Sequence, residues 1–157
     1  MCGPRRRPCE DAGVNERHTA VPGDAAHLPA LLTFLQDFWS ELNLPATEAL
    51  PFELALEEVF MNVVMHGSHT DRAPLVKVSM TLVGGGVTLT VEDDGPPFDP
   101  LSLPAPDVTA SLEARRVGGL GVFLVRKVMD SVRYERRDAT NLLQMTKNIT
   151  EVGPAPK

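Results

Sequence analysis

Cysteine is scarce in this sequence of 157 residues, and the only two, Cys2 and Cys9, both lie within the first ten positions. A fold held together by disulfides distributes its cysteines along the chain, and a structural zinc site needs about four ligands at close spacing. The scarcity therefore excludes both kinds of site. It predicts a protein of a reducing compartment, which we expect to be the cytoplasm.

Long apolar runs and strong positive charge are also missing. No stretch of about eighteen apolar residues occurs, so the sequence predicts no membrane-spanning helix. Residues 1–12 are basic in part but lack the apolar segment of a secretory signal, and we expect a disordered tail there. The formal net charge of −6 argues against nucleic acid or an anionic membrane as a partner.

The length and the hydrophobic fraction of 43% predict one domain with a packed core, at 13–150, and a short C-terminal tail at 151–157. Hairpin pairs of strands and grouped helices favour the α+β class and a two-layer α/β sandwich. The predicted segments are an edge strand at 14–21, a helix at 28–42 capped by Asp24, a helix from a cap at Thr47 to Gly67, strands at 75–83 and 86–93, a proline-rich loop at 94–117, a glycine-opened helix at 119–131, and strands at 131–138 and 141–149 with a turn near 139–141.

Three polar side chains share one face of the second predicted helix. Glu58, Asn62 and His66 are four residues apart, so each step drifts only about 40° around the helix axis. An asparagine oxygen can complete the shell of a Mg²⁺ ion that already carries phosphate oxygens, and a carboxylate one turn away can accept a proton. Taken alone, the stripe is better explained as a solvated helix face, because a glutamate and an asparagine four residues apart are a short and common pattern. Glu57 is the second candidate base, and His66 fits a capping or packing role better.

Two later motifs fit a nucleotide. Asp93 and Gly95 follow a strand, where a carboxylate can accept a hydrogen bond from an exocyclic amine and a glycine leaves room for a flat base. The segment from Gly118 through Gly119 and Leu120 to Gly121 opens a helix, whose N-terminal amides can hold phosphates. Each motif alone also suits an ordinary turn or helix start. The ordered combination predicts a site for ATP and Mg²⁺.

The chain resembles the GHKL, or Bergerat-fold, ATP-binding superfamily, and most of all its small anti-sigma factor serine/threonine kinases of the RsbW/SpoIIAB type. The matching segments are ELALEEVFMNVVMHG, DDGPPFDP, GGLGVFLVRKVMDSVRY and LLQMTK, and the resemblance extends over about residues 14–148. It implies a mixed, mostly antiparallel sheet covered by about three helices. It also implies a homodimer that phosphorylates a STAS-domain anti-anti-sigma antagonist and binds a sigma factor.

The resemblance implies a role for each site residue. On helix 47–67 it implies Glu58 as the general base and Asn62 as the Mg²⁺ ligand. For the adenine it implies a contact from Asp93, with Thr146 beside it and Gly95 packed closely. For the phosphates it implies binding by Gly118, Gly119, Leu120 and Gly121, stabilisation of the γ-phosphate by Arg116 or Arg115, and an ATP lid at residues 100–117. Pro97 departs from the family pattern, which has glycine there. An alternative therefore stays open, in which the chain binds ATP and sequesters a sigma factor or another protein without phosphorylating its partner.

Overall fold

The computed structural model describes residues 15–67, 71–105, 109 and 119–149. Its sheet has five strands in the order β1-β2-β3-β5-β4, and every neighbouring pair is antiparallel. The strands are β1 (Asn15–Pro22), β2 (Leu75–Val83), β3 (Gly86–Asp93), β4 (Ser131–Arg137) and β5 (Thr140–Asn148). The helices are α1 (Leu28–Glu41), α2 (Leu50–His66) and α3 (Gly119–Val128), with short 3-10 turns η1 (Ala25–His27), η2 (Ala46–Glu48) and η3 (Pro100–Ser102).

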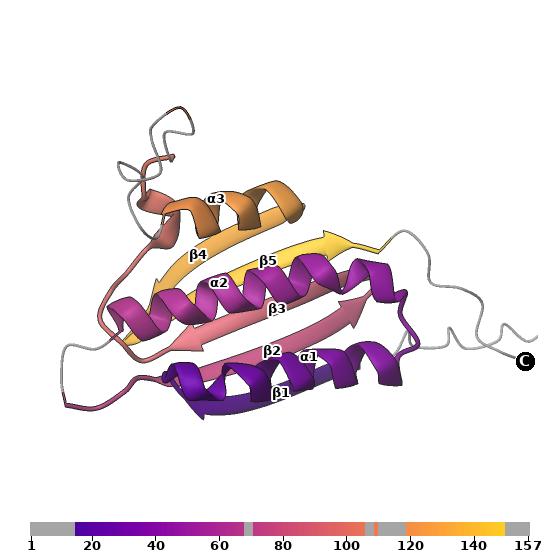
Figure 1. The fold of residues 1–157 in the computed structure, drawn as a ribbon, viewed down its shortest axis with the longest axis horizontal. Coiled ribbons are helices and arrows are strands. Elements are labelled where there is room, and N and C mark those ends of the chain that lie inside the picture. Colours follow the sequence, from indigo (N-terminus) through magenta and orange to yellow (C-terminus); the bar gives the residue numbers. More distant parts are fainter. Residues whose placement is uncertain (1–14, 68–70, 106–108, 110–118, 150–157) are drawn as a thin grey trace, which may run out of the picture.

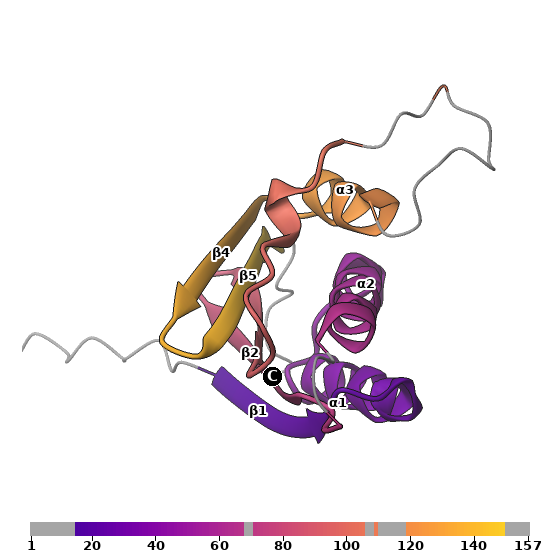
Figure 2. The ribbon, with the colours of Figure 1, turned by 90° about the vertical axis from the view of Figure 1, so that its left-hand side faces the viewer.

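All three α-helices cover the same face of the sheet, and the other face carries no helix in the part of the chain that the structure describes (Figures 1 and 2). Helix α1 packs on β1 and β2, α2 packs on β3, and α3 packs on α2 and β4. The predicted two-layer α+β sandwich is therefore confirmed, with β1 at one edge as expected. The sheet is more regular than the expected mixed sheet, because no parallel pair occurs among the described strands.

The core lies between the helices and the sheet. Helical spacing on α1 and α2 and alternation on the strands direct apolar side chains to this layer. Trp39 packs against Phe52 with ring centroids 5.0 Å apart, and its indole N–H donates to the Pro45 carbonyl at 2.9 Å. Residues with no exposed surface include Leu31, Leu35, Phe52, Leu56, Phe60, Val76, Val78, Met80, Val87, Leu89 and Met145.

Two predicted helix caps turn out differently. Asp24 does accept a hydrogen bond, from Ala26 N at 2.9 Å, but it caps the 3-10 turn η1 that precedes α1. The predicted cap at Thr47 is wrong, because Thr47 lies inside η2 and α2 begins only at Leu50, with Pro51 in its first turn and no side-chain cap. Proline is tolerated there because first-turn amides have no partner within the helix.

The two hairpins fix the register of the strands, which in turn positions the residues of the candidate site. Gly84 and Gly85, between β2 and β3, both have positive φ as predicted for a glycine turn. The turn between β4 and β5 lies at Asp138 and Ala139, earlier than predicted, so β5 already begins at Thr140 and not at Asn141. No described helix combines the length and apolar character needed to cross a membrane.

Candidate nucleotide-binding site

Helix α2 presents Asn62 to the interior, where it is only 7% exposed. Its Nδ2 is buried and has no hydrogen-bond partner among the described residues. A buried amide with an unused hydrogen-bonding group is costly unless something polar faces it, which makes Asn62 a candidate ligand contact. Within the described residues, no three His, Cys, Asp or Glu side chains gather as a potential metal site.

One turn earlier on α2, the Glu58 carboxylate lies against Gly121 near the start of α3. A Cβ on Gly121 would lie 2.7 Å from Glu58 Cδ and closer still to Oε2, so only glycine permits this approach. Burial raises the pKa of Glu58, and the neighbouring Glu57 carboxylate raises it further. Glu57 itself is exposed. The structure thus joins two motifs that lie 63 residues apart in the chain, counted from Glu58 to Gly121.

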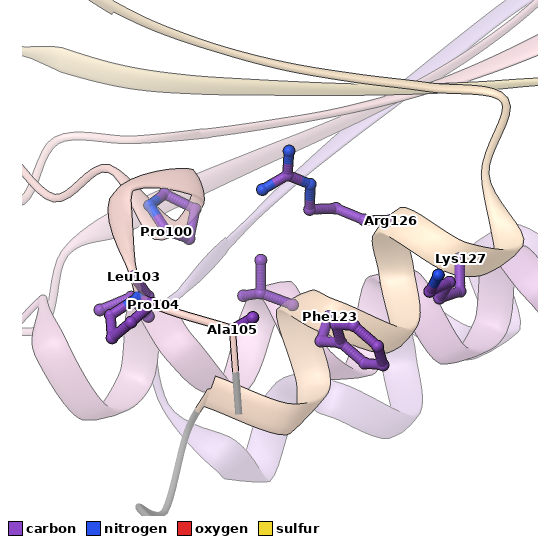
Figure 3. Close-up of a pocket in the computed structure, with 8 residues that line it drawn as sticks. Pro100, Leu103, Pro104, Ala105, Phe123, Arg126 and Lys127 are labelled. Atoms are coloured by element: carbon purple, nitrogen blue, oxygen red, sulfur yellow. The ribbon is translucent and has the colours of Figure 1, made fainter. Parts of the chain in front are cut away.

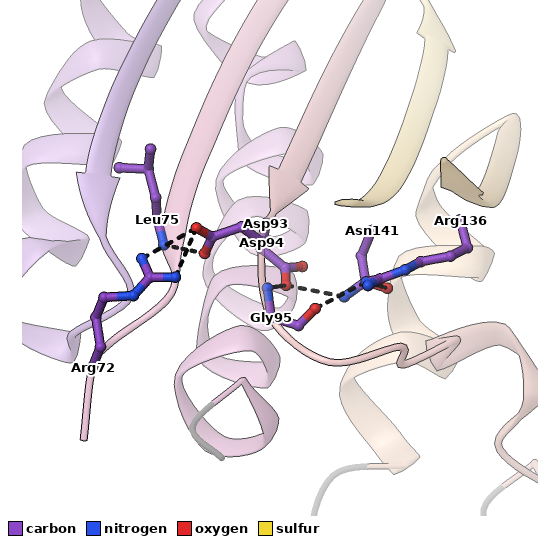
Figure 4. Close-up of polar contacts among 7 residues, drawn as sticks. All are labelled: Arg72, Leu75, Asp93, Asp94, Gly95, Arg136 and Asn141. Atoms are coloured by element: carbon purple, nitrogen blue, oxygen red, sulfur yellow. Dashed lines mark hydrogen bonds and ion pairs between the residues drawn. The ribbon is translucent and has the colours of Figure 1, made fainter. Parts of the chain in front are cut away.

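The end of β3 forms a tight polar turn around Asp93, which is 8% exposed (Figure 4). Asp93 Oδ1 accepts hydrogen bonds from Gly95 N and from Asn141 Nδ2, each at 3.0 Å. Among the described residues, nothing donates to Oδ2, which leaves that oxygen for a ligand. Burial raises the pKa of Asp93, opposed by hydrogen bonds from Asn141 and Gly95 and by the positive charge of Arg136.

Gly95 is needed for packing within the turn itself. A Cβ there would lie 2.8 Å from Asp93 Oδ1 and 3.3 Å from Gly67 Cα, so the turn sits directly on the loop that follows α2. Close packing of Gly95 was predicted. Its further role of admitting a flat base stays a prediction.

Asn141 is a site residue that the sequence analysis missed. It is 5% exposed and lies opposite Asp93 in the register between β3 and β5. Its Nδ2 donates to Asp93 Oδ1 and, at 2.8 Å, to the Pro96 carbonyl. Its Oδ1 accepts from Phe98 N, Tyr134 Oη and Arg136 Nη1. A single asparagine expected beside a turn carries no recognisable signal, and only the strand register reveals it.

Thr146 lies away from Asp93 on strand β5, although the family resemblance implies a place beside adenine. It pairs with Thr88, and the two hydroxyl oxygens are 2.9 Å apart. Thr146 is five residues from Asn141 along an extended strand, which is about 17 Å. Because strand side chains alternate, an odd step also turns Thr146 to the face of the sheet away from α2. This geometry does not support the implied adenine contact of Thr146, which stays a prediction, and Asn141 is the residue of β5 that contacts Asp93.

Two hollows adjoin these residues. The smaller has a volume of about 30 Å³ and is lined by Asn62, Asp93, Asn141 and apolar neighbours that include Phe98 and Pro100. The larger, of about 350 Å³, lies between residues 100–105 and helix α3 (Figure 3). Arg126 and Lys127 line the larger one, and Pro100 borders both. The smaller hollow has room for a water molecule or two and not for a nucleotide base.

His66 packs on the segment around Phe98 and does not act together with Glu58 and Asn62 on the face of α2. Its ring stacks on Phe98 at 4.6 Å between centroids and 18° between planes. The contact ties the end of α2 to the loop that closes the smaller hollow, in line with the predicted packing role.

The remaining predicted residues lie at or beyond the edge of the described chain. Gly119 begins α3, and Leu120 on its first turn is 41% exposed. Gly118, Arg115 and Arg116 lie outside the described residues, as does most of the predicted lid. Their roles stay predictions.

Comparison with known families agrees with this geometry. The model of the histidine kinase-like ATPase domain matches residues 21–147. The chain belongs to this family. The match spans both helix α2 with Glu58 and Asn62 and the turn at Asp93.

Similar proteins include two bacterial kinases. The serine/threonine-protein kinase BtrW of Bordetella bronchiseptica is 29% identical over 112 residues, which cover 71% of this chain and 75% of BtrW. The serine-protein kinase RsbW of Listeria monocytogenes is 28% identical over 103 residues, covering 63% of this chain and 65% of RsbW. The crystal structure of the RsbU and RsbW domains of a Mycobacterium tuberculosis protein has the same fold, with a TM-score of 0.63 and 16% identity. Its alignment covers 86% of this chain and 32% of that one.

Proposed function

We propose that this protein is an ATP-dependent serine/threonine-protein kinase and anti-sigma regulatory factor. It phosphorylates a STAS-domain anti-anti-sigma antagonist and exchanges that partner for a sigma factor. Membership of the histidine kinase-like ATPase family and similarity to two proteins named as serine/threonine or serine kinases support the proposal. From the family we also expect a homodimer.

The contact between the Glu58 carboxylate and Gly121 carries the proposal. It brings a half-buried carboxylate with a raised pKa to the N-terminal turn of α3. Helix N-termini bind phosphates through free amides and the helix dipole, and a base with a raised pKa suits proton transfer near neutral pH. A phosphate bound at this turn therefore lies next to a proton acceptor, which is what phosphotransfer to a hydroxyl needs.

In the proposed reaction, the serine or threonine oxygen of the partner bonds to the γ-phosphorus of ATP. The bond from that phosphorus to the β–γ bridging oxygen breaks, and ADP leaves. Glu58 accepts the hydroxyl proton, and Arg116 or Arg115 stabilises the charge on the transferring group. The phosphates lie along Gly118, Gly119, Leu120 and Gly121.

Asn62 suits a Mg²⁺ ligand because its amide is buried, faces the small hollow and lacks an internal partner for Nδ2. An asparagine amide binds the ion through oxygen, and the assignment of oxygen and nitrogen within an amide can be exchanged by a simple flip. When bound, Mg²⁺ neutralises charge on the phosphate oxygens. Asp93 then recognises the base through Oδ2, with Asn141 holding Oδ1.

Calorimetric titration of ATP with Mg²⁺ into the wild type and Asn62→Ala is the first test. We expect the wild type to bind and Asn62→Ala to bind far more weakly. A wild type that binds no nucleotide would refute ATP recognition.

Phosphotransfer to a cognate STAS-domain protein is the second test. Glu58→Gln should abolish transfer and retain nucleotide and partner binding, because it removes the proton acceptor and preserves shape. Glu57→Gln is the matched control, since Glu57 is exposed on the same helix, and it should transfer phosphate normally. Loss of transfer in Glu57→Gln alone would assign the base to Glu57.

The alternative function is an ATP-binding regulator that sequesters its partner without phosphorylating it. Pro97, an exposed residue just after the Asp93 turn, favours this alternative because it stiffens the start of the lid. Nucleotide binding by the wild type without any phosphotransfer to a cognate STAS-domain protein would establish it.

A further inference from the structure

Arg136, on edge strand β4, reaches across to the turn that holds Asp93. Its Nη1 donates to the Gly95 carbonyl at 2.9 Å and to Asn141 Oδ1 at 3.1 Å (Figure 4). The other arginines of this strand behave differently. Arg137 forms an ion pair with Glu135 at the surface, and Arg133 is exposed. Only Arg136, among the described arginines, connects β4 with the turn after β3.

The turn is held from two sides. On one side, Asp94 accepts hydrogen bonds from Leu75 N at 2.7 Å and from both terminal nitrogens of Arg72 at 3.1 and 3.2 Å. On the other side, Arg136 holds the Gly95 carbonyl and Asn141. Asp93 lies between these anchors, with Oδ1 occupied by two donors. The direction of Oδ2 therefore depends on Gly95 and Asn141, which donate to Oδ1 and which Arg136 contacts.

We infer that Arg136 is a positioning residue for base recognition, which it performs by clamping Gly95 and Asn141 so that Asp93 Oδ2 faces the base. The inference rests on the proposed ATP site. Arg136 is half-buried, so its guanidinium works in partial shelter from water, where hydrogen bonds from a charged donor are stronger than in bulk solvent. It does not touch the base itself.

Inosine triphosphate separates positioning from a general structural role. It carries the same triphosphate as ATP but has a carbonyl in place of the adenine amine, so its 6-position cannot donate to Asp93 Oδ2, and its only donor on that edge of the base is the neighbouring N1–H. A well-positioned Asp93 favours ATP and gives inosine triphosphate no benefit. A disturbed clamp should therefore weaken ATP binding and leave inosine triphosphate binding nearly unchanged, whereas a damaged fold weakens both.

The experiment measures Kd for ATP and for inosine triphosphate, each with Mg²⁺, in four full-length proteins. These are the wild type, Arg136→Ala, Arg136→Lys and the matched control Arg133→Ala. We expect Arg136→Ala to raise the Kd for ATP about tenfold, because losing both hydrogen bonds of Arg136 releases the turn and weakens the hydrogen bond that Asp93 makes to the base. Arg136→Lys should restore part of the affinity because it keeps one charged donor, and Arg133→Ala should match the wild type.

Two results would overturn the inference about Arg136 without refuting nucleotide binding by the wild type. One is an ATP affinity unchanged in Arg136→Ala, and the other is an equal loss for both nucleotides. Should Arg136→Ala fail to fold, the ratio of the two Kd values in Arg136→Lys decides instead, because an unaltered ratio contradicts positioning. A wild type that binds neither nucleotide would refute the proposed function and this inference with it.

Discussion

Replacing Asp93 by asparagine tests base recognition most directly, because the structure fixes how the new amide must lie. Both neighbours of Oδ1, Gly95 N and Asn141 Nδ2, are donors at 3.0 Å. The amide oxygen of the variant must therefore take the Oδ1 position and its nitrogen the Oδ2 position. A donor would then face the adenine amine, which is also a donor.

The expected loss follows from removing one hydrogen bond to a charged acceptor, worth about 1.5–3 kcal/mol. That corresponds to an increase of about 10- to 150-fold in the Kd for ATP. Inosine triphosphate, whose carbonyl accepts a hydrogen bond, should bind better to Asp93→Asn than to the wild type. Stability should not fall, because burial raises the pKa of Asp93 and so penalises the charge that the substitution removes.

Calorimetry with both nucleotides and thermal denaturation without nucleotide provide the assay. The control is Asp94→Asn, which alters the neighbouring carboxyl, whose side chain is 37% exposed and paired with Arg72. A partly exposed pair of this kind contributes about 0–1 kcal/mol, so the control should bind ATP like the wild type. Unchanged ATP affinity in Asp93→Asn would refute the assignment of Asp93 as the base contact.

Three further predictions concern the general base Glu58, the strand residue Thr146 and the pH dependence of stability. Gly121→Ala should abolish most phosphotransfer, because the new Cβ displaces the flexible Glu58 carboxyl. The melting temperature should stay unchanged or rise, because alanine favours a helix more than glycine does. Normal phosphotransfer in this variant would contradict the contact between Glu58 and Gly121. Thr146→Val should leave the ATP affinity unaltered, as measured by titration. Denaturation should show a loss of about 0.5–1.5 kcal/mol of stability, because the hydrogen bond to Thr88 is lost. A large loss of ATP affinity would instead place Thr146 in the nucleotide site. The raised pKa of Asp93 means that the folded state holds its proton more tightly than the unfolded state, so this residue's contribution to stability falls as pH rises from about 4 through the raised pKa. Denaturation across this range should show a shallower decline in Asp93→Asn than in the wild type, and identical slopes would contradict the shift.

The sequence alone predicted the elements whose signals are local. Helix α2 and the stripe with Glu58 and Asn62 follow from a spacing of four residues, and strands β2 and β3 follow from alternation and from the Gly84–Gly85 turn. The ordered motifs likewise pointed to the family that the comparison then showed. Local signals worked less well at boundaries, as Thr47 shows, since caps depend on where neighbouring turns begin.

The tertiary structure decided which residues meet. Asn141 lies 48 residues from Asp93 in sequence, and Arg136 lies 41 residues from Gly95. These contacts exist because β5 pairs with β3 and β4 pairs with β5, in one register. A shift of one residue in either pairing would turn every side chain to the opposite face. Thr146 fits the family pattern as a residue type, yet it lies on the opposite face from the site for this reason. Periodicity within a segment sets which side chains share a face, whereas the pairing between distant strands sets which faces build a site.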